Sequence, residues 1–223
     1  MRMRRKKNLD ERLESCDRHL LVKEKKGFYS WEEKDKYDFL DFIKIFGNEN
    51  PVWLEIGAGK GSFAFETAKR NPDINVVAVE KISNVIIEAL ERAKEEDPAN
   101  CMFMNCSAEI LGYFIKPHTI ERIFLNFSCP YPKSTYKNRR LTYYRFLDIY
   151  KQLLKENGEI HFKTDDKDFF SFSVQSFSEN GFIIKNVSLD LNEKNFPENI
   201  VTEYEAMFRE IGKPIYRLEA HLA

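Results

Sequence analysis

The chain alternates between short apolar runs and longer segments whose apolar positions repeat every three or four residues. The longer segments predict helices at residues 34–46, 62–70, 83–95, 140–155, 166–179 and 203–211. The short runs predict seven strands, at residues 52–56, 75–79, 101–104, 120–127, 158–163, 182–187 and 214–218. Strands that alternate with helices of this length predict an α/β fold with a mostly parallel sheet and helices on both faces. Ligands of such sheets bind beyond the carboxyl ends of the strands, so the segments there become candidates for function.

Length and composition limit the number of domains and the kinds of partner expected for the chain. At 223 residues, with no linker-like stretch, the chain fits one domain (1–223), with a core at 51–223 and a basic extension at 1–33. The first seven residues include five basic and no acidic side chains, which is typical of solvated charge or of a nucleic-acid contact. The four cysteines form no CxxC pair and have no metal-ligand spacing, so we expect a reduced, cytoplasmic protein without a metal. The sequence lacks apolar runs of membrane-spanning length, so we expect no membrane partner.

The first candidate segment follows the strand predicted at 52–56. It reads Gly57-Ala58-Gly59-Lys60-Gly61, a GxGxG turn that differs from dinucleotide and phosphate-loop motifs. Its glycines permit close backbone approach to a ligand. Glu55, two residues earlier, disfavours a diphosphate and suits a cationic ligand, and Glu80 ends the next strand where such folds bind ribose hydroxyls. The combination favours nucleoside binding over a plain glycine turn.

The second candidate segment follows the strand predicted at 120–127. Between Pro130 and Leu147 it contains five basic residues and no acidic one, interleaved with aromatic side chains. The cations are Lys133, Lys137, Arg139, Arg140 and Arg145. Phosphates need such cations, and unpaired bases stack on aromatic rings or arginine planes. An amphipathic helix with a solvated basic face remains the alternative, and the balanced net charge of −1 does not decide between them.

Several blocks in order along the chain resemble the bacterial single-subunit tRNA (guanine-N7-)-methyltransferases. The blocks are Arg2-Met3-Arg4, Leu54 to Gly61, Val79-Glu80, Asn126-Phe127, Pro130-Tyr131-Pro132-Lys133, Arg139-Arg140-Leu141-Thr142, Lys163-Thr164-Asp165, Thr202-Glu203-Tyr204-Glu205, Phe208 and Gly212-Lys213-Pro214-Ile215-Tyr216. The Pro-x-x-Lys, Arg-Arg-Leu-Thr and Thr-Glu-Tyr-Glu elements are absent from generic methyltransferases. The blocks run from Arg2 to Tyr216, so the resemblance covers nearly the whole chain.

The resemblance implies a Rossmann-like class I methyltransferase fold that uses S-adenosyl-L-methionine to methylate N7 of a guanosine in the variable loop of tRNA. The implied cofactor positions are Glu55, Gly57, Gly59, Gly61, Glu80, Ser107 and Cys129. The expected tRNA-binding positions are Lys133, Arg139, Arg140, Asp165, Thr202 and Glu205. Cys129 and Asp165 stand at the catalytic positions. We expect a cytoplasmic monomer or homodimer.

The chain departs from the family pattern at three places. Ser107 and Cys129 stand where the family usually has aspartates, and Thr135-Tyr136 replaces an Arg-His pair. N7 of guanine is unprotonated at neutral pH, so methyl transfer to it needs no general base, and alignment supplies much of the rate. The order Cys129-Pro130 favours a pocket-lining cysteine over a nucleophile. The alternatives are a catalytically impaired tRNA- or cofactor-binding paralogue and a methyltransferase with a different substrate.

Overall fold

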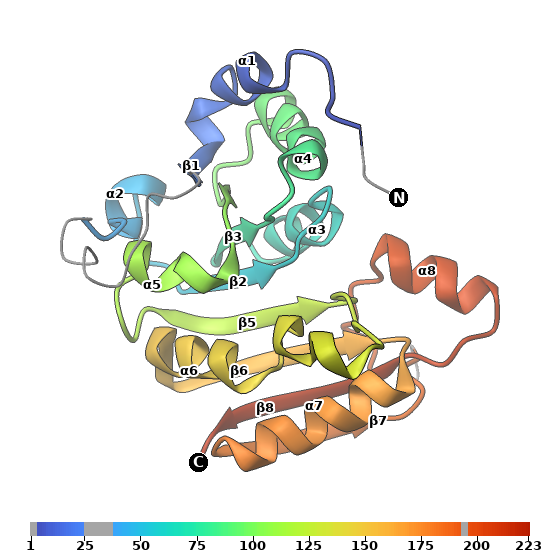
Figure 1. The fold of residues 1–223 in the computed structure, drawn as a ribbon. Coiled ribbons are helices and arrows are strands. Elements are labelled where there is room, and N and C mark those ends of the chain that lie inside the picture. Colours follow the sequence, from blue (N-terminus) through green and yellow to red (C-terminus); the bar gives the residue numbers. More distant parts are fainter. Residues whose placement is uncertain (1–3, 25–37, 193–195) are drawn as a thin grey trace. The chain divides into compact units, whose positions relative to one another are not determined.

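The computed structural model describes residues 4–24, 38–192 and 196–223. The chain forms two compact units, Met1–Lys116 and Pro117–Ala223 (Figure 1). Both units are α/β structures, in agreement with the fold class that the sequence predicts. Within the described residues, no helix is both long and apolar enough to cross a membrane.

The first unit is built on a parallel sheet with the strand order β1-β4-β3-β2. The strands are β1 (Leu20–Lys23), β2 (Val52–Ile56), β3 (Asn75–Val79) and β4 (Cys101–Asn105). Every residue of β3 is buried, as expected for a central parallel strand covered on both faces. The α-helices of this unit are α1 (Leu9–Glu14), α2 (Phe42–Phe46), α3 (Ser62–Arg70), α4 (Ser83–Glu96) and α5 (Leu111–Phe114).

The described part of the N-terminal segment, residues 4–24, packs within this unit. Its strand β1 pairs with β4, with Leu20 opposite Phe103. Helix α1 packs against α4, and its buried Leu9 and Leu13 join the same apolar core as α4. Arg12 also donates two hydrogen bonds to Glu91 of α4, at 2.6 and 2.7 Å. The structure thus adds one strand, from the predicted extension at 1–33, to the seven that the sequence predicts.

The second unit contains a mixed sheet with the strand order β5-β6-β8-β7. The strands are β5 (Ile120–Asn126), β6 (Leu154–Thr164), β7 (Phe182–Ser188) and β8 (Tyr216–Leu222). β5 and β6 are parallel, whereas β8 is antiparallel to both β6 and β7. The helices are α6 (Tyr144–Leu153), α7 (Lys167–Glu179), α8 (Glu203–Glu210) and the 3₁₀ helix η4 (Ser134–Arg139). The ring of Phe162 on β6 packs against Phe169 and Phe177 of α7.

Two predicted helices differ from the structure at their ends by more than one residue. The helix expected at 140–155 begins at Tyr144, because residues 140–143 form a turn between η4 and α6. It ends at Leu153 because Leu154 already pairs with Ile120 as the first residue of β6. The helix expected at 34–46 is observed only as Phe42–Phe46, capped by the Asp41 side chain, and residues 34–37 lie outside the described residues.

Candidate functional site

The glycine turn after β2 needs backbone conformations that other residues rarely adopt. Gly57, Gly59 and Gly61 have φ angles of 85°, 59° and 80°. The backbone N–H groups of Gly57 and Ala58 donate to the carbonyl of Val79, at 2.8 and 3.0 Å, so the turn is fixed to the carboxyl end of β3. A side chain at Gly61 would collide with α4 and β4, whereas the space at Gly59 is open. The turn is therefore closely packed at Gly61 and open to a ligand at Gly59.

Glu80 joins two features that the sequence analysis predicts separately to bind a cofactor. One carboxylate oxygen accepts a hydrogen bond from the N–H of Gly59 at 3.1 Å, and the other accepts from the N–H of Ile82 at 2.7 Å. Burial raises the pKa of the Glu80 carboxyl, while these backbone hydrogen bonds act in the opposite direction. The structure thus brings Glu80 and the glycine turn into direct contact.

The remaining predicted cofactor positions of this unit lie on β2 and after β4. Glu55 is buried near the carboxyl end of β2. Ser107 is also buried, and its N–H donates to the carboxylate of Glu24 at 2.7 Å. Its hydroxyl donates to the Glu109 carboxylate, at 3.3 Å. Asn105, which sequence reasoning did not single out, donates from its amide to the carbonyl of Glu80 at 2.8 Å and thereby connects β4 to the cofactor side.

In the second unit, the loop after β5 has two aromatic residues with left-handed backbone conformations. Phe127 has a φ of 49° and Tyr131 a φ of 42°. Bulky residues rarely adopt such angles, and strained positions of this kind cluster at ligand sites. Cys129 lies between them with an exposed side chain. Arg140 donates to the carbonyls of Pro130 and Tyr131, at 2.8 and 3.1 Å, so this predicted phosphate contact also holds the loop in place.

Of the other predicted cations of this segment, Lys133, Lys137 and Arg139 are exposed, whereas Arg145 is half-buried. Lys133 immediately precedes η4 and Arg139 is its last residue, and no residue of η4 is buried. The guanidinium of Arg139 lies 4.6 Å from the ring centroid of Tyr136, which is itself 42% exposed. A cation and a ring exposed together offer both contacts that an RNA strand needs. The geometry thus places a basic and aromatic surface at η4.

Asp165 stands immediately after β6, at the carboxyl end of the strand. Its carboxylate accepts a hydrogen bond from the ammonium of Lys213 at 2.7 Å, and its side chain is 17% exposed. The same ammonium lies 4.6 Å from the ring centroid of Phe208 on α8. Sequence reasoning missed the role of Lys213, because its partner is 48 residues away.

Thr202 and Glu205 are both buried, at the start of α8. The Thr202 hydroxyl caps the helix by accepting from the N–H of Glu205 at 3.0 Å. The Glu205 carboxylate is fully buried and accepts from Lys163 at 2.9 Å, from Asn199 at 2.6 Å and from Arg209 at 2.6 Å. Lys163 also donates to Asn199 and to the carbonyl of Ile200. Lys163 belongs to one of the family blocks, but its ion pair was not predicted, since a single lysine in a strand carries no signal for a buried ion pair.

A second charged cluster lies on β6 and β8, away from the ends that the sequence analysis selects. His161 Nε2 lies 2.7 Å from a Glu159 oxygen and 3.9 Å from a Glu219 oxygen. These three side chains are ligand types for a metal ion. Both carboxylates, however, already face cations, namely Arg122, Lys185 and Arg217. We therefore interpret the cluster as an ion network that stabilises the sheet.

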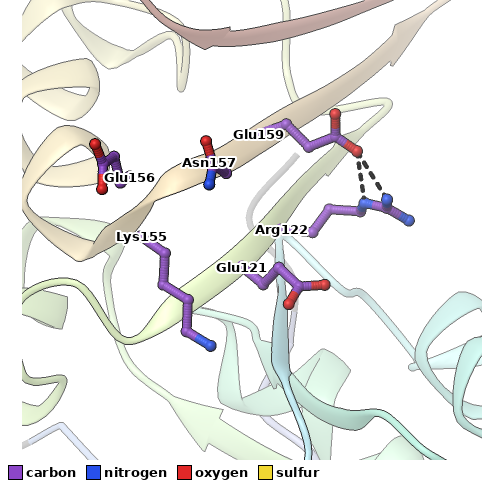
Figure 2. A pocket seen from close by; sticks show the side chains of 6 residues that line it. All are labelled: Glu121, Arg122, Lys155, Glu156, Asn157 and Glu159. Atoms are coloured by element: carbon purple, nitrogen blue, oxygen red, sulfur yellow. Dashed lines mark hydrogen bonds and ion pairs between the residues drawn. The ribbon is translucent and has the colours of Figure 1, made fainter.

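A pocket of about 420 Å³ adjoins this network (Figure 2). Arg122 and Glu159, joined by an ion pair, form part of its wall. The full lining consists of Glu121, Arg122, Lys155, Glu156, Asn157 and Glu159. These residues lie near the beginning of β5 and in the first half of β6, opposite the carboxyl ends where ligands bind. The pocket is therefore not part of the candidate site.

Comparison with known proteins defines the class of this chain. A family profile described as "Putative methyltransferase" matches residues 49–218. A solved structure of a SAM dependent methyltransferase from Aquifex aeolicus matches with a TM-score of 0.57 at 12% identity, over 98% of this chain and 100% of that one. A 16S rRNA methyltransferase matches with a TM-score of 0.63 at 12% identity, over 83% of this chain and 95% of that one. The fold is that of the class I methyltransferases.

Curated relatives identify the family within this class. A relative from Streptococcus equi subsp. zooepidemicus is 39% identical over 220 residues, which cover 99% of each chain. A relative from Bacillus subtilis is 44% identical over 175 residues, 78% of this chain and 82% of the relative. Both are named tRNA (guanine-N(7)-)-methyltransferase. The chain belongs to the tRNA (guanine-N7-)-methyltransferase family, as the sequence motifs indicated.

Proposed function

We propose that this chain transfers a methyl group from S-adenosyl-L-methionine to N7 of a guanosine in the variable loop of tRNA. The observation that carries the proposal is the placement of the family's motif residues at the carboxyl ends of strands. Glu80 and Asp165 immediately follow β3 and β6, and the glycine turn follows β2. Sheets of this class bind their ligands at those ends. We expect the reaction to take place in the cytoplasm.

The residues of the first unit fit the cofactor. Gly59 would leave open space around an added Cβ, so its backbone permits close approach of a ligand. Glu55 and Glu80 offer carboxylates that suit ribose hydroxyls and cationic groups, and Ser107 adds a hydroxyl after β4. When bound, S-adenosyl-L-methionine supplies an electrophilic methyl group on a sulfonium. Gly57 and Gly61 keep the turn in the conformation that this binding requires.

The residues of the second unit fit a guanine held by RNA. Lys133 and Arg139 are exposed cations for phosphates, and Arg140 holds the loop that contains Cys129. The carboxylate of Asp165 suits the N1–H and N2–H₂ edge of guanine, which presents only donors. Thr202 and Glu205 hold the start of α8 next to this site.

The chemistry does not require a general base. The lone pair of guanine N7 attacks directly, so the enzyme contributes alignment and charge stabilisation. Positive charge moves onto the purine during the transfer, and the carboxylate of Asp165 stabilises it. Cys129, exposed beside Pro130, lines the substrate position and replaces the usual aspartate without removing an indispensable proton acceptor.

The test uses unmodified tRNA and tritium-labelled S-adenosyl-L-methionine. We expect label in the tRNA, and chemical cleavage at N7-methylguanosine should map it to the variable loop. Label at background with tRNA still bound would contradict the proposal. That result would favour a non-catalytic paralogue, the alternative that Cys129 and Ser107 motivate. Label in a small molecule, with Arg139→Gln leaving turnover unchanged, would indicate a different substrate.

A further inference from the structure

Three aromatic rings lie against one another beyond the carboxyl end of β5. Phe127 stacks on Tyr204 with ring centroids 6.5 Å apart and on Phe208 at 5.9 Å. Tyr204 and Phe208, four residues apart on one face of α8, are 6.3 Å from each other. The three planes are inclined to one another by only 25° to 29°. We call Phe127, Tyr204 and Phe208 the aromatic stack.

The backbone and the burial of the aromatic stack distinguish it from ordinary core packing. Phe127 is held in the left-handed region, with a φ of 49°, by a hydrogen bond from its N–H to the Lys163 carbonyl at 2.9 Å. Such strain persists where the surrounding structure fixes it, and it is common at ligand sites. Tyr204 remains 58% exposed, although its two ring neighbours are half-buried. A large ring therefore stays open to solvent on a firmly held support.

Two ion pairs fix the aromatic stack next to Asp165. Lys163 anchors Glu205, the residue after Tyr204, in a fully buried pair. Lys213 lies 4.6 Å from the Phe208 ring centroid and donates to Asp165 at 2.7 Å. The position of Tyr204 is thus coupled through short contacts to the carboxylate proposed to bind guanine.

We propose that the aromatic stack, with Tyr204 as its open ring, is a subsite that stacks an unpaired nucleobase of the tRNA substrate. The inference rests on the proposed function and deepens it. Unpaired bases stack on exposed aromatic rings, and a ring that is already immobilised loses little entropy on binding. Lys213, paired with Asp165, places charge beside the Phe208 ring of the stack, which suits a base with polar edges better than an apolar helix.

The test compares three single variants in binding to an unmodified tRNA transcript. Tyr204→Leu removes the ring and keeps apolar bulk, so we expect binding about 5- to 150-fold weaker, the range for one base–aromatic stack. Tyr204→Phe retains the ring and should bind within about two-fold of wild type. The matched control is Ile211→Ala, which shortens a side chain 65% exposed at the end of the same helix. The salt dependence of Tyr204→Leu should match wild type, because no phosphate contact is lost.

Specific outcomes would overturn the inference. Binding of Tyr204→Leu within about two-fold of wild type would do so. A weaker affinity for S-adenosyl-L-methionine with unchanged tRNA affinity would assign the ring to the cofactor. A changed oligomeric state with unchanged tRNA affinity would assign it to a contact between copies.

If Tyr204→Leu does not fold by circular dichroism, Phe208→Leu serves as the second variant with the same expectation. Wild-type enzyme that binds tRNA without methylating it would contradict the proposed function alone, since the binding comparison still tests the stack.

Discussion

The two units hold their candidate residues by different means. In the first unit the backbone does most of the positioning, because glycine conformations shape the turn and the N–H of Gly59 fixes Glu80. In the second unit, side-chain ion pairs position the site, with Lys163 bound to Glu205 and Lys213 bound to Asp165. The proposed cofactor side is thus built from local geometry, and the proposed substrate side from partners that are distant in sequence.

This difference bears on how each side tolerates change. A glycine turn depends on few residues, and substitution there acts directly on the ligand space. A buried ion pair depends on two residues at once, so loss of either one leaves an uncompensated charge. Substitutions at these ion pairs of the second unit should therefore lower both stability and substrate binding. Substitutions in the glycine turn of the first unit should link the two effects less strongly.

The largest effect is expected from Lys163→Met. This variant leaves the fully buried Glu205 carboxylate with only Asn199 and Arg209, so the free energy of unfolding should fall by about 3–5 kcal/mol, toward the lower end of that range. Urea unfolding followed by circular dichroism measures the change. The double variant Lys163→Met/Glu205→Leu removes both charges and should recover most of the loss. A double variant no more stable than Lys163→Met would show that the ion pair is not the cause.

Asp165→Ala should have the next largest effect, on catalysis and not on cofactor binding. Loss of one charge-stabilising group at a reacting centre costs about 10²–10³ in rate, so kcat/KM for tRNA should fall by that factor. Lys213 loses its partner in the same variant, and Lys213→Met provides the comparison that separates the two contributions. His161→Gln is the control away from the site, and equal losses in Asp165→Ala and His161→Gln would contradict the assignment.

Two glycines test the claim that the backbone builds the cofactor side. A Cβ at Gly61 would lie 2.9 Å from the Ala89 Cβ and 3.1 Å from the Phe103 ring, in addition to the strain of a φ of 80°. Gly61→Ala should therefore lower the free energy of unfolding by about 2 kcal/mol. Gly59→Ala meets no atom within 4 Å and should cost about 1 kcal/mol, from its φ of 59° alone. Equal losses would mean that crowding at Gly61 is relieved by movement of α4.

The smallest expected effect is a change in how protein stability depends on pH, and it concerns His161 in the ion network on β6 and β8. Burial lowers the pKa of His161, although Glu159 and Glu219 oppose the shift, so the folded protein keeps the imidazole neutral where the unfolded chain protonates it. Wild-type stability should fall as the pH drops from about 7 to about 5, through the ordinary histidine range. Urea unfolding of His161→Gln over the same range should show a shallower slope. An unchanged slope would assign the pH dependence to a titrating group outside the network, such as His19, whose pKa burial also lowers.

The sequence predicted the elements better than it predicted their partners. The apolar runs of β2, β3 and β4 identified buried parallel strands because such strands have no polar face. The strand β1 was missed, since its four residues lie within a charged segment. Glycine spacing predicted the tight turn after β2, because positive φ angles depend on the glycines themselves. The partners of Asp165 and Glu205 had no such signal, because an ion pair depends on three-dimensional proximity that spacing does not encode.

The pairing of β1 with β4 has a consequence for how the protein forms during synthesis. Leu20 leaves the ribosome long before Phe103, its partner in the sheet, has been made. Strand β1 therefore cannot pair in the sheet until β4 has been made, and contacts between such distant segments form slowly. Until it joins, the backbone edge of β4 is open to pairing with other chains. An N-terminal truncation through Lys23 would make that transient condition permanent and favour aggregation during expression.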